Sequence, residues 1–151
     1  MQYRSPAWLL GGHAQTIWPA LYALRRKTPP LPLRRERWIT PDQDFVDVDL
    51  QHASRPDRPL LVLFHGLEGS SKSHYAEAFA DWAAAHDLNF ALPHFRGCSG
   101  ELNIAPRAYH SGDHQEIEWL LERFRKMHQL VGGQKLAVSY THLRAHETLM
   151  N

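Results

Sequence analysis

A continuous apolar run from Leu60 to Phe64 constrains the fold of this chain more than any other feature of its sequence. Pro59 precedes the run and Gly66 follows it closely, so the run has the length of a strand rather than a helix. Five apolar residues in succession are typical of a strand that is covered on both faces. The sequence therefore predicts an α/β protein with layers of helix on either side of a sheet.

The segments after this run alternate between helical and strand patterns. Apolar residues at helical spacing predict two helices, and further apolar runs predict two more buried strands. The predicted order is a helix over 73–86, a strand over 89–95, a helix over 112–128 and a strand beginning at residue 135. Strands that alternate with helices at such short spacing indicate a parallel sheet with right-handed crossovers.

The region before the run predicts an antiparallel hairpin. Residues 34–40 form the first strand and residues 41–44 the turn, after which Val46, Val48 and Leu50 alternate with two aspartates. This period of two predicts a half-buried strand. Residues 8–24 predict short helical turns, interrupted at Pro19.

Composition restricts the class of protein. The 151 residues are 43% hydrophobic and 22% charged, which excludes a disordered, collagenous or coiled-coil chain and favours one domain. No apolar run approaches the roughly 18 residues of a membrane span, and we expect no secretory signal, because the first residues lack a basic segment followed by an apolar core. The single cysteine, Cys98, suits a reducing compartment, so we expect a cytoplasmic protein.

Charge is uneven along the chain, although the net charge is only +1. Seven basic residues and one acid lie in residues 1–41, including the cluster formed by Arg25 to Lys27 with Arg34 and Arg35. The cluster could be an arm for RNA or phospholipid, but it lacks aromatic stacking residues, so a solvated surface is favoured. We expect no nucleic-acid partner, and we leave peripheral membrane contact open.

Two glycine-rich loops follow the first two predicted parallel strands. His65 to Ser70 follows one strand and Phe95 to Glu101 follows the other, so both loops lie at the carboxyl edge of the sheet. The first loop could aim a backbone N–H at a developing oxyanion, or it could be an ordinary connecting turn. Neither loop has the spacing of a phosphate-binding loop.

Metal and thiol chemistry have weaker support. The pairs His110/His114 and His142/His146 are four residues apart, but neither has the HExxH pattern, so solvated histidines are favoured over a metal-dependent hydrolase. Cys98 has no identifiable base and is interpreted as a small residue packed in a turn. We predict no metal and no cofactor.

Six short motifs occur in order along the chain. They are Trp8 to Pro19, Pro41 to Phe45, His65 to Ser71, Ser73 to Tyr75, Phe95 to Glu101 and Arg107 to Gly112. Together these motifs resemble the YheT-like branch of the α/β-hydrolases, which contains carboxylesterases and lipid-acting hydrolases. The resemblance covers about residues 5–138 and departs from the family at Gln43, where a glycine is usual. It implies the N-terminal half of an α/β-hydrolase fold with an incomplete sheet.

The resemblance also implies the site. Leu67 would supply an oxyanion-hole N–H, and the loops around it would line a pocket for a small-molecule ester. The pocket residues implied are His65, Gly66, Phe95, Arg96, Gly97, Cys98, Ser99, Gly100, Tyr109, His110 and Ser111.

The family's nucleophile motif, Gly-x-Ser-x-Gly, is not found after Val138. Thr141 falls in the nucleophile slot, flanked by Ser139 and Leu143 where glycines allow the strained turn to pack. Neither an acid nor a base histidine is identified. Residues 139–151 resemble translated adapter sequence, so we expect 1–138 to be the N-terminal part of one hydrolase domain and 139–151 a non-native tail.

These features predict a fragment of a serine hydrolase that is itself inactive because the Ser-Asp-His triad is absent. A non-catalytic ligand-binding module of the same fold is the alternative. The strand at residue 135 would become an open edge, and we therefore expect the chain to self-associate.

Overall fold

The computed structural model describes residues 8, 11–22, 31–66, 69–106 and 113–140. The chain divides into two units, residues 1–30 and residues 31–151, which are described separately. No helix in these described ranges is long and apolar enough to cross a lipid bilayer.

The first unit contains the helix α1, Gly11–Tyr22. The prediction that Pro19 interrupts the helical turns is wrong, because α1 continues through that residue. Pro19 cannot donate to the carbonyl four residues earlier, and the helix ends three residues after it, at Tyr22. The indole of Trp18 packs edge-on against that of Trp8, with ring centroids 4.8 Å apart.

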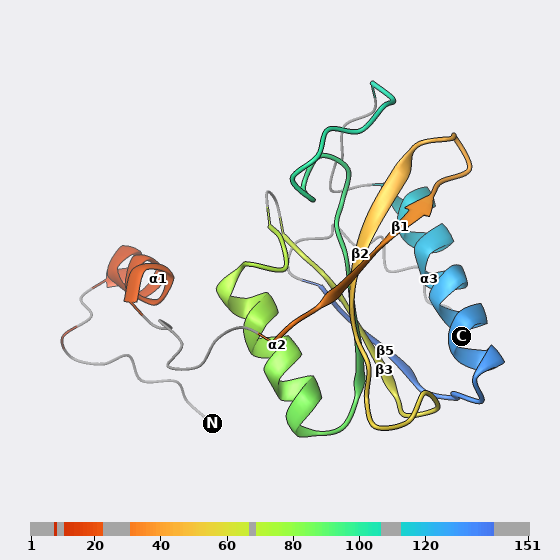
Figure 1. Cartoon of the computed structure of the whole chain (residues 1–151). Coiled ribbons are helices and arrows are strands. Elements are labelled where there is room, and N and C mark those ends of the chain that lie inside the picture. Colours follow the sequence, from red (N-terminus) through yellow and green to blue (C-terminus); the bar gives the residue numbers. More distant parts are fainter. Residues whose placement is uncertain (1–7, 9–10, 23–30, 67–68, 107–112, 141–151) are drawn as a thin grey trace. The chain divides into compact units, whose positions relative to one another are not determined.

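The second unit is built on one five-stranded sheet (Figure 1). The strands are β1 Arg34–Ile39, β2 Phe45–Gln51, β3 Leu60–Phe64, β4 Asn89–Pro93 and β5 Leu136–Tyr140. Their order is β1-β2-β4-β3-β5; β4, β3 and β5 are parallel, and β1 and β2 form the antiparallel hairpin. The predicted hairpin and parallel strands are confirmed.

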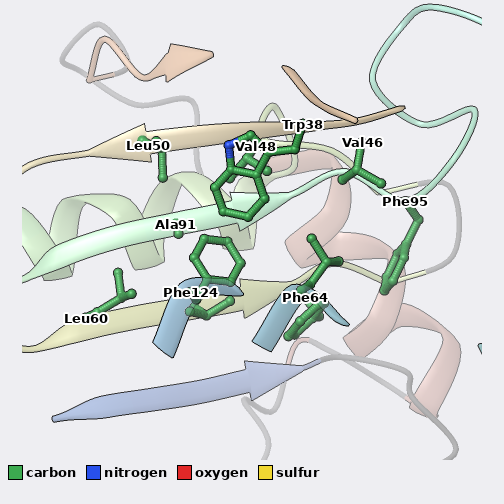
Figure 2. Packing of buried hydrophobic residues seen from close by; sticks show 11 residues of the cluster. Trp38, Val46, Val48, Leu50, Leu60, Phe64, Ala91, Phe95 and Phe124 are labelled. Atoms are coloured by element: carbon green, nitrogen blue, oxygen red, sulfur yellow. The ribbon is translucent and has the colours of Figure 1, made fainter. Parts of the chain in front are cut away.

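Helices α2, His74–Ala85, and α3, His114–Leu130, lie on opposite sides of the sheet (Figure 1). β3 alternates between the two cores, since Leu61 and Leu63 pack with the alanines of α2, while Val62 packs with α3. Figure 2 shows the second of these cores, in which Phe124 of α3 lies 4.8 Å from Trp38 of β1 between ring centroids. Both faces of β3 are therefore buried from solvent, as the apolar run predicts.

The half-buried character predicted for β2 is wrong. Asp47 and Asp49 are about as buried as Val46 and Val48, with which they alternate. Each carboxylate binds an arginine of β1 through two hydrogen bonds, Asp47 with Arg37 and Asp49 with Arg35. A buried carboxylate is stable only when it is paired, and these partners come from the neighbouring strand.

β5 lies at an edge of the described sheet. It pairs with β3 along its whole length, including Ser139 with Leu63 and Tyr140 with Phe64. Val138 is 41% exposed and Tyr140 is 50% exposed. The predicted domain boundary at residue 138 stays a prediction, and residues 141–151 lie outside the described part of the chain.

Candidate active site

His65 joins the loops that follow β3 and β4. The side chain is fully buried, and both ring nitrogens bind backbone groups. Nδ1 donates to the carbonyl of Gly66 at 2.7 Å, and Nε2 accepts from the N–H of Phe95 at 3.0 Å. This pattern requires the neutral ring with its proton on Nδ1. Burial lowers the pKa of His65 to about 4, which keeps the ring neutral at ordinary pH.

The turn after β3 is held on both sides of its centre. The N–H of Gly66 donates to Tyr75 Oη of α2 at 2.9 Å, and the N–H of Gly69 donates to the Gly66 carbonyl at 2.9 Å. A Cβ atom at Gly69 would lie 2.5 Å from Tyr75 Oη, so only glycine fits there. Leu67, the predicted oxyanion-hole residue, lies outside the described residues, between these two anchors.

Arg96, in the loop after β4, lies at the centre of a buried ionic cluster. Its guanidinium contacts Asp42 at 2.7 Å, Asp44 at 3.1 Å and Glu116 of α3 at 2.5 Å. The hydrogen bond to Asp42 is the main cause that raises the pKa of Arg96, and the same bond lowers the pKa of Asp42. The cluster joins the β1–β2 turn, the loop after β4 and the start of α3.

Asp44 organises the backbone around this cluster. Burial opposes its ionisation, but hydrogen bonds from the Ile104 N–H, the Asn103 side chain and the Ala105 N–H hold its pKa below the ordinary value. Its two oxygens accept from main-chain and side-chain donors of the segment 103–105 and from Arg96. The carboxylate therefore fixes the path of the loop after β4.

A hollow of about 150 Å³ opens beside the ionic cluster. Among the predicted pocket residues that the structure describes, Arg96 lines it, and its guanidinium is already bound by three carboxylates. The other lining residues were not predicted as site residues. They are Thr40, Pro41, Asp42, Gln115, Glu116 and Trp119.

The remaining predicted residues lie along the same loop in different environments. Phe95 is buried in the core and Cys98 packs partly against it. Ser99 accepts a hydrogen bond from Arg35 through its carbonyl at 2.8 Å. Gly97 and Gly100 have positive φ angles of 78° and 101°, which explains the glycines of this loop.

Several predicted residues lie outside the described part of the chain. These are Tyr109, His110 and Ser111 of the pocket, Thr141 in the nucleophile slot, and His142 and His146 of the histidine pairs. Among the described residues, no group of three or more histidine, cysteine or acidic side chains is arranged to hold a metal ion.

The sequence analysis missed a buried pair of Asp49 and His94. Asp49 Oδ2 lies 2.8 Å from His94 Nε2, and Arg35 binds the same carboxylate. Burial opposes ionisation of Asp49, but the hydrogen bonds from Arg35 and His94 lower its pKa. The two residues are 45 positions apart, so no local spacing could reveal the pair; the position of His94 directly after β4 was the one available signal.

No protein-family model matches the chain. The chain is 41% identical over 111 residues to the Escherichia coli (strain K12) protein named "Putative esterase YheT". The aligned residues cover 72% of this chain and 32% of that protein. It is 26% identical over 94 residues to a monoacylglycerol lipase of Saccharomyces cerevisiae, covering 62% of this chain and 20% of the lipase.

A structural match agrees with these relatives. The structure of a variant of Saccharomyces cerevisiae monoglyceride lipase with a substrate analogue covers 80% of this chain and 38% of the lipase chain, with a TM-score of 0.55 and 15% identity. The chain is related to YheT and has part of an α/β-hydrolase fold. The predicted resemblance to the YheT-like branch is thus confirmed.

The chain spans a third or less of the length of the curated relatives it matches. Within an α/β-hydrolase fold, the loops that follow β3 and β4 lie at the edge of the sheet where ligands of open α/β sheets bind. His65, Tyr75 and Arg96 anchor these loops in the described structure.

Proposed function

We propose that this chain is part of a serine hydrolase that acts on carboxylic or acylglycerol esters through an acyl-enzyme. The observation that carries the proposal is the turn at His65–Gly66, which follows β3 and is fixed by hydrogen bonds from His65 to two backbone groups. The chain that contains this turn is related to proteins named as esterases and lipases. Such a turn can hold a backbone N–H where negative charge develops during ester cleavage.

In the proposed reaction a serine attacks the ester carbonyl carbon and a histidine takes its proton. The Leu67 N–H stabilises the oxyanion, the alcohol leaves with the proton from the histidine, and water then hydrolyses the acyl-enzyme. The N–H of Gly66 is not proposed for this role, because it already donates to Tyr75 Oη. The loops at 95–100 and 109–111 would line the ester pocket.

We propose that the 151-residue chain alone does not perform this reaction. It contains no Gly-x-Ser-x-Gly motif, and the slot after β5 holds Thr141 between Ser139 and Leu143. Leucine has no room in the sharp strand-to-helix turn that exposes the nucleophile. Residues 139–151 would then be a non-native segment that replaces the elbow.

An esterase assay tests this part of the proposal. With p-nitrophenyl butyrate the purified chain is expected to give only the background rate, and Thr141→Ala is expected to leave that rate unchanged. Hydrolysis above background that disappears in Thr141→Ala would contradict it. Saturable binding of an acyl ligand without turnover would instead support a non-catalytic binding module.

The proposed partner is a small-molecule ester, and we propose no nucleic-acid partner and no cofactor. The single cysteine also supports a reducing, cytoplasmic location. Fractionation of source cells, with immunodetection of residues 31–138, would locate the protein.

A further inference from the structure

The loop after β4 presents two large apolar side chains to solvent. Leu102 is 90% exposed and Ile104 is 81% exposed, and only Leu130 reaches a similar value among the described large apolar residues. Asn103, which stands between the two, turns inward to the protein. We call Leu102 and Ile104 the apolar tip.

The exposure of the tip is imposed by the fold. Asn103 donates to Asp44 at 3.0 Å and accepts from the Gly97 N–H at 2.7 Å. The N–H of Ile104 also donates to Asp44, which is fully buried. Because these bonds hold the Asn103 side chain and the backbone that follows it, the two apolar neighbours of Asn103 cannot fold back onto the core without breaking them.

The tip lies at the edge of the sheet that carries the candidate site. The chain leaves β4 at its carboxyl end and extends beyond the sheet before it returns to α3 (Figure 1). The nearest charged neighbour in sequence, Glu101, is paired with Arg37 at 2.9 Å. The negative charge of the Glu101 carboxylate is therefore balanced by Arg37. This pairing lowers the free-energy cost of bringing the carboxylate near an apolar phase.

We propose that the apolar tip inserts into the surface of a lipid bilayer. Two side chains are far too small for a specific protein interface, which needs roughly 1,000 Å² of buried surface. A fluid lipid phase requires no complementary shape, and each methylene group that it buries contributes favourable free energy of binding. The inference goes beyond the proposed function, since insertion requires no hydrolysis, although it would place the candidate site at a source of lipid esters.

Sedimentation with phosphatidylcholine vesicles tests the proposal on the 151-residue chain. The double variant Leu102→Ser with Ile104→Ser is expected to bind at least about tenfold more weakly than the parent, given the methylene groups removed. The matched control is Leu130→Ser. Leu130 is 87% exposed, but it ends α3 and lies where the chain leads back to the start of β5, away from the tip. Absence of parental binding, or equal loss in the control, overturns the proposal.

A second measurement follows the tip itself. The fluorescence of Leu102→Trp is expected to be quenched by brominated phosphatidylcholine beyond the parental level, whereas that of Leu130→Trp is not. Binding should also change little between about 0.1 and about 0.5 M salt, because insertion is apolar. Equal quenching at both positions, or binding that salt abolishes, would show that other residues contact the bilayer and would contradict insertion of the apolar tip.

Discussion

At the scale of single residues, His65 shows how a histidine at the end of a strand can be structural. Its two nitrogens bind one carbonyl and one N–H, and its edge contact with Phe95 places the ring centroids 4.8 Å apart. Protonation would turn Nε2 into a donor that faces the N–H of Phe95. His65 can therefore connect the loops after β3 and β4 only while its ring is neutral.

This arrangement predicts a pH-dependent stability. The folded pKa, about 4, lies below the ordinary 6.5, so the unfolded chain binds the proton first as pH falls. The contribution of His65 is complete above pH 6.5, decreases as pH falls toward 4, and amounts to a loss of about 2 kcal/mol between pH 7 and pH 5.

Urea unfolding at low protein concentration at these two pH values checks the prediction. His65→Gln retains an acceptor but does not titrate, so its free energy of unfolding should decrease less between pH 7 and pH 5. His52→Gln, at an exposed position, is the control and should behave as the parent. Equal pH dependence in all three proteins would show that His65 does not titrate as described.

At the scale of elements, Arg96 connects three segments that are distant in sequence. Its partners lie 54, 52 and 20 residues away, in the β1–β2 turn and in α3. Both Asp44 and Glu116 are buried with it. Removing the guanidinium would leave these carboxylates without their charge partner.

Arg96→Met is expected to destabilise the second unit by about 3–5 kcal/mol, the usual cost of breaking a buried ion pair on one side. Arg55→Met, which removes an exposed pair with Asp57, should change the free energy of unfolding far less, because solvent screens that pair. Thermal or urea unfolding measures both. Similar small effects for the two variants would mean that the buried cluster contributes no more than the exposed pair.

The elements that sequence analysis predicts well are those with a local pattern. β3, β4, α2 and α3 follow from apolar runs and helical spacing, and the hairpin follows from a turn between two strands. The burial of Asp47 and Asp49 could not be predicted in this way. It depends on which arginines face them across β1, and that register is a tertiary property.

The candidate site shows the same difference between features with a local sequence pattern and features that depend on tertiary contacts. The two glycine-rich loops are visible in the sequence because Gly97 and Gly100 have positive φ angles and because a Cβ atom at Gly69 would clash with Tyr75. The anchors, Tyr75 on Gly66 and Asp44 on the segment 103–105, come from other elements and have no sequence signature.

At the scale of the whole molecule, the two edges of the described sheet differ in charge. β1 carries Arg34, Arg35, Glu36 and Arg37, whereas β5 has no charged residue in Leu136–Tyr140. Charged edge strands resist pairing with another chain, and uncharged ones favour it. We therefore propose that the chain self-associates through β5.

Val138→Lys is expected to weaken this self-association by about tenfold or more, since a lysine on an edge strand opposes pairing. Sedimentation velocity over a range of protein concentrations measures it. The control Leu130→Lys adds the same charge at an exposed position outside the sheet and should associate as the parent. A monomeric parent, or equal effects of the two lysines, would contradict an interface at β5.

We propose that this chain is part of a serine hydrolase and that its residues from 139 onward replace the nucleophile elbow. Sequencing the source gene across the codons for Val138 and Ser139 tests it most directly. We expect the reading frame of the gene to continue from Val138 into Gly-x-Ser-x-Gly. A gene that encodes Ser139 to Asn151 and then stops would contradict the account and leave a non-catalytic module to be tested.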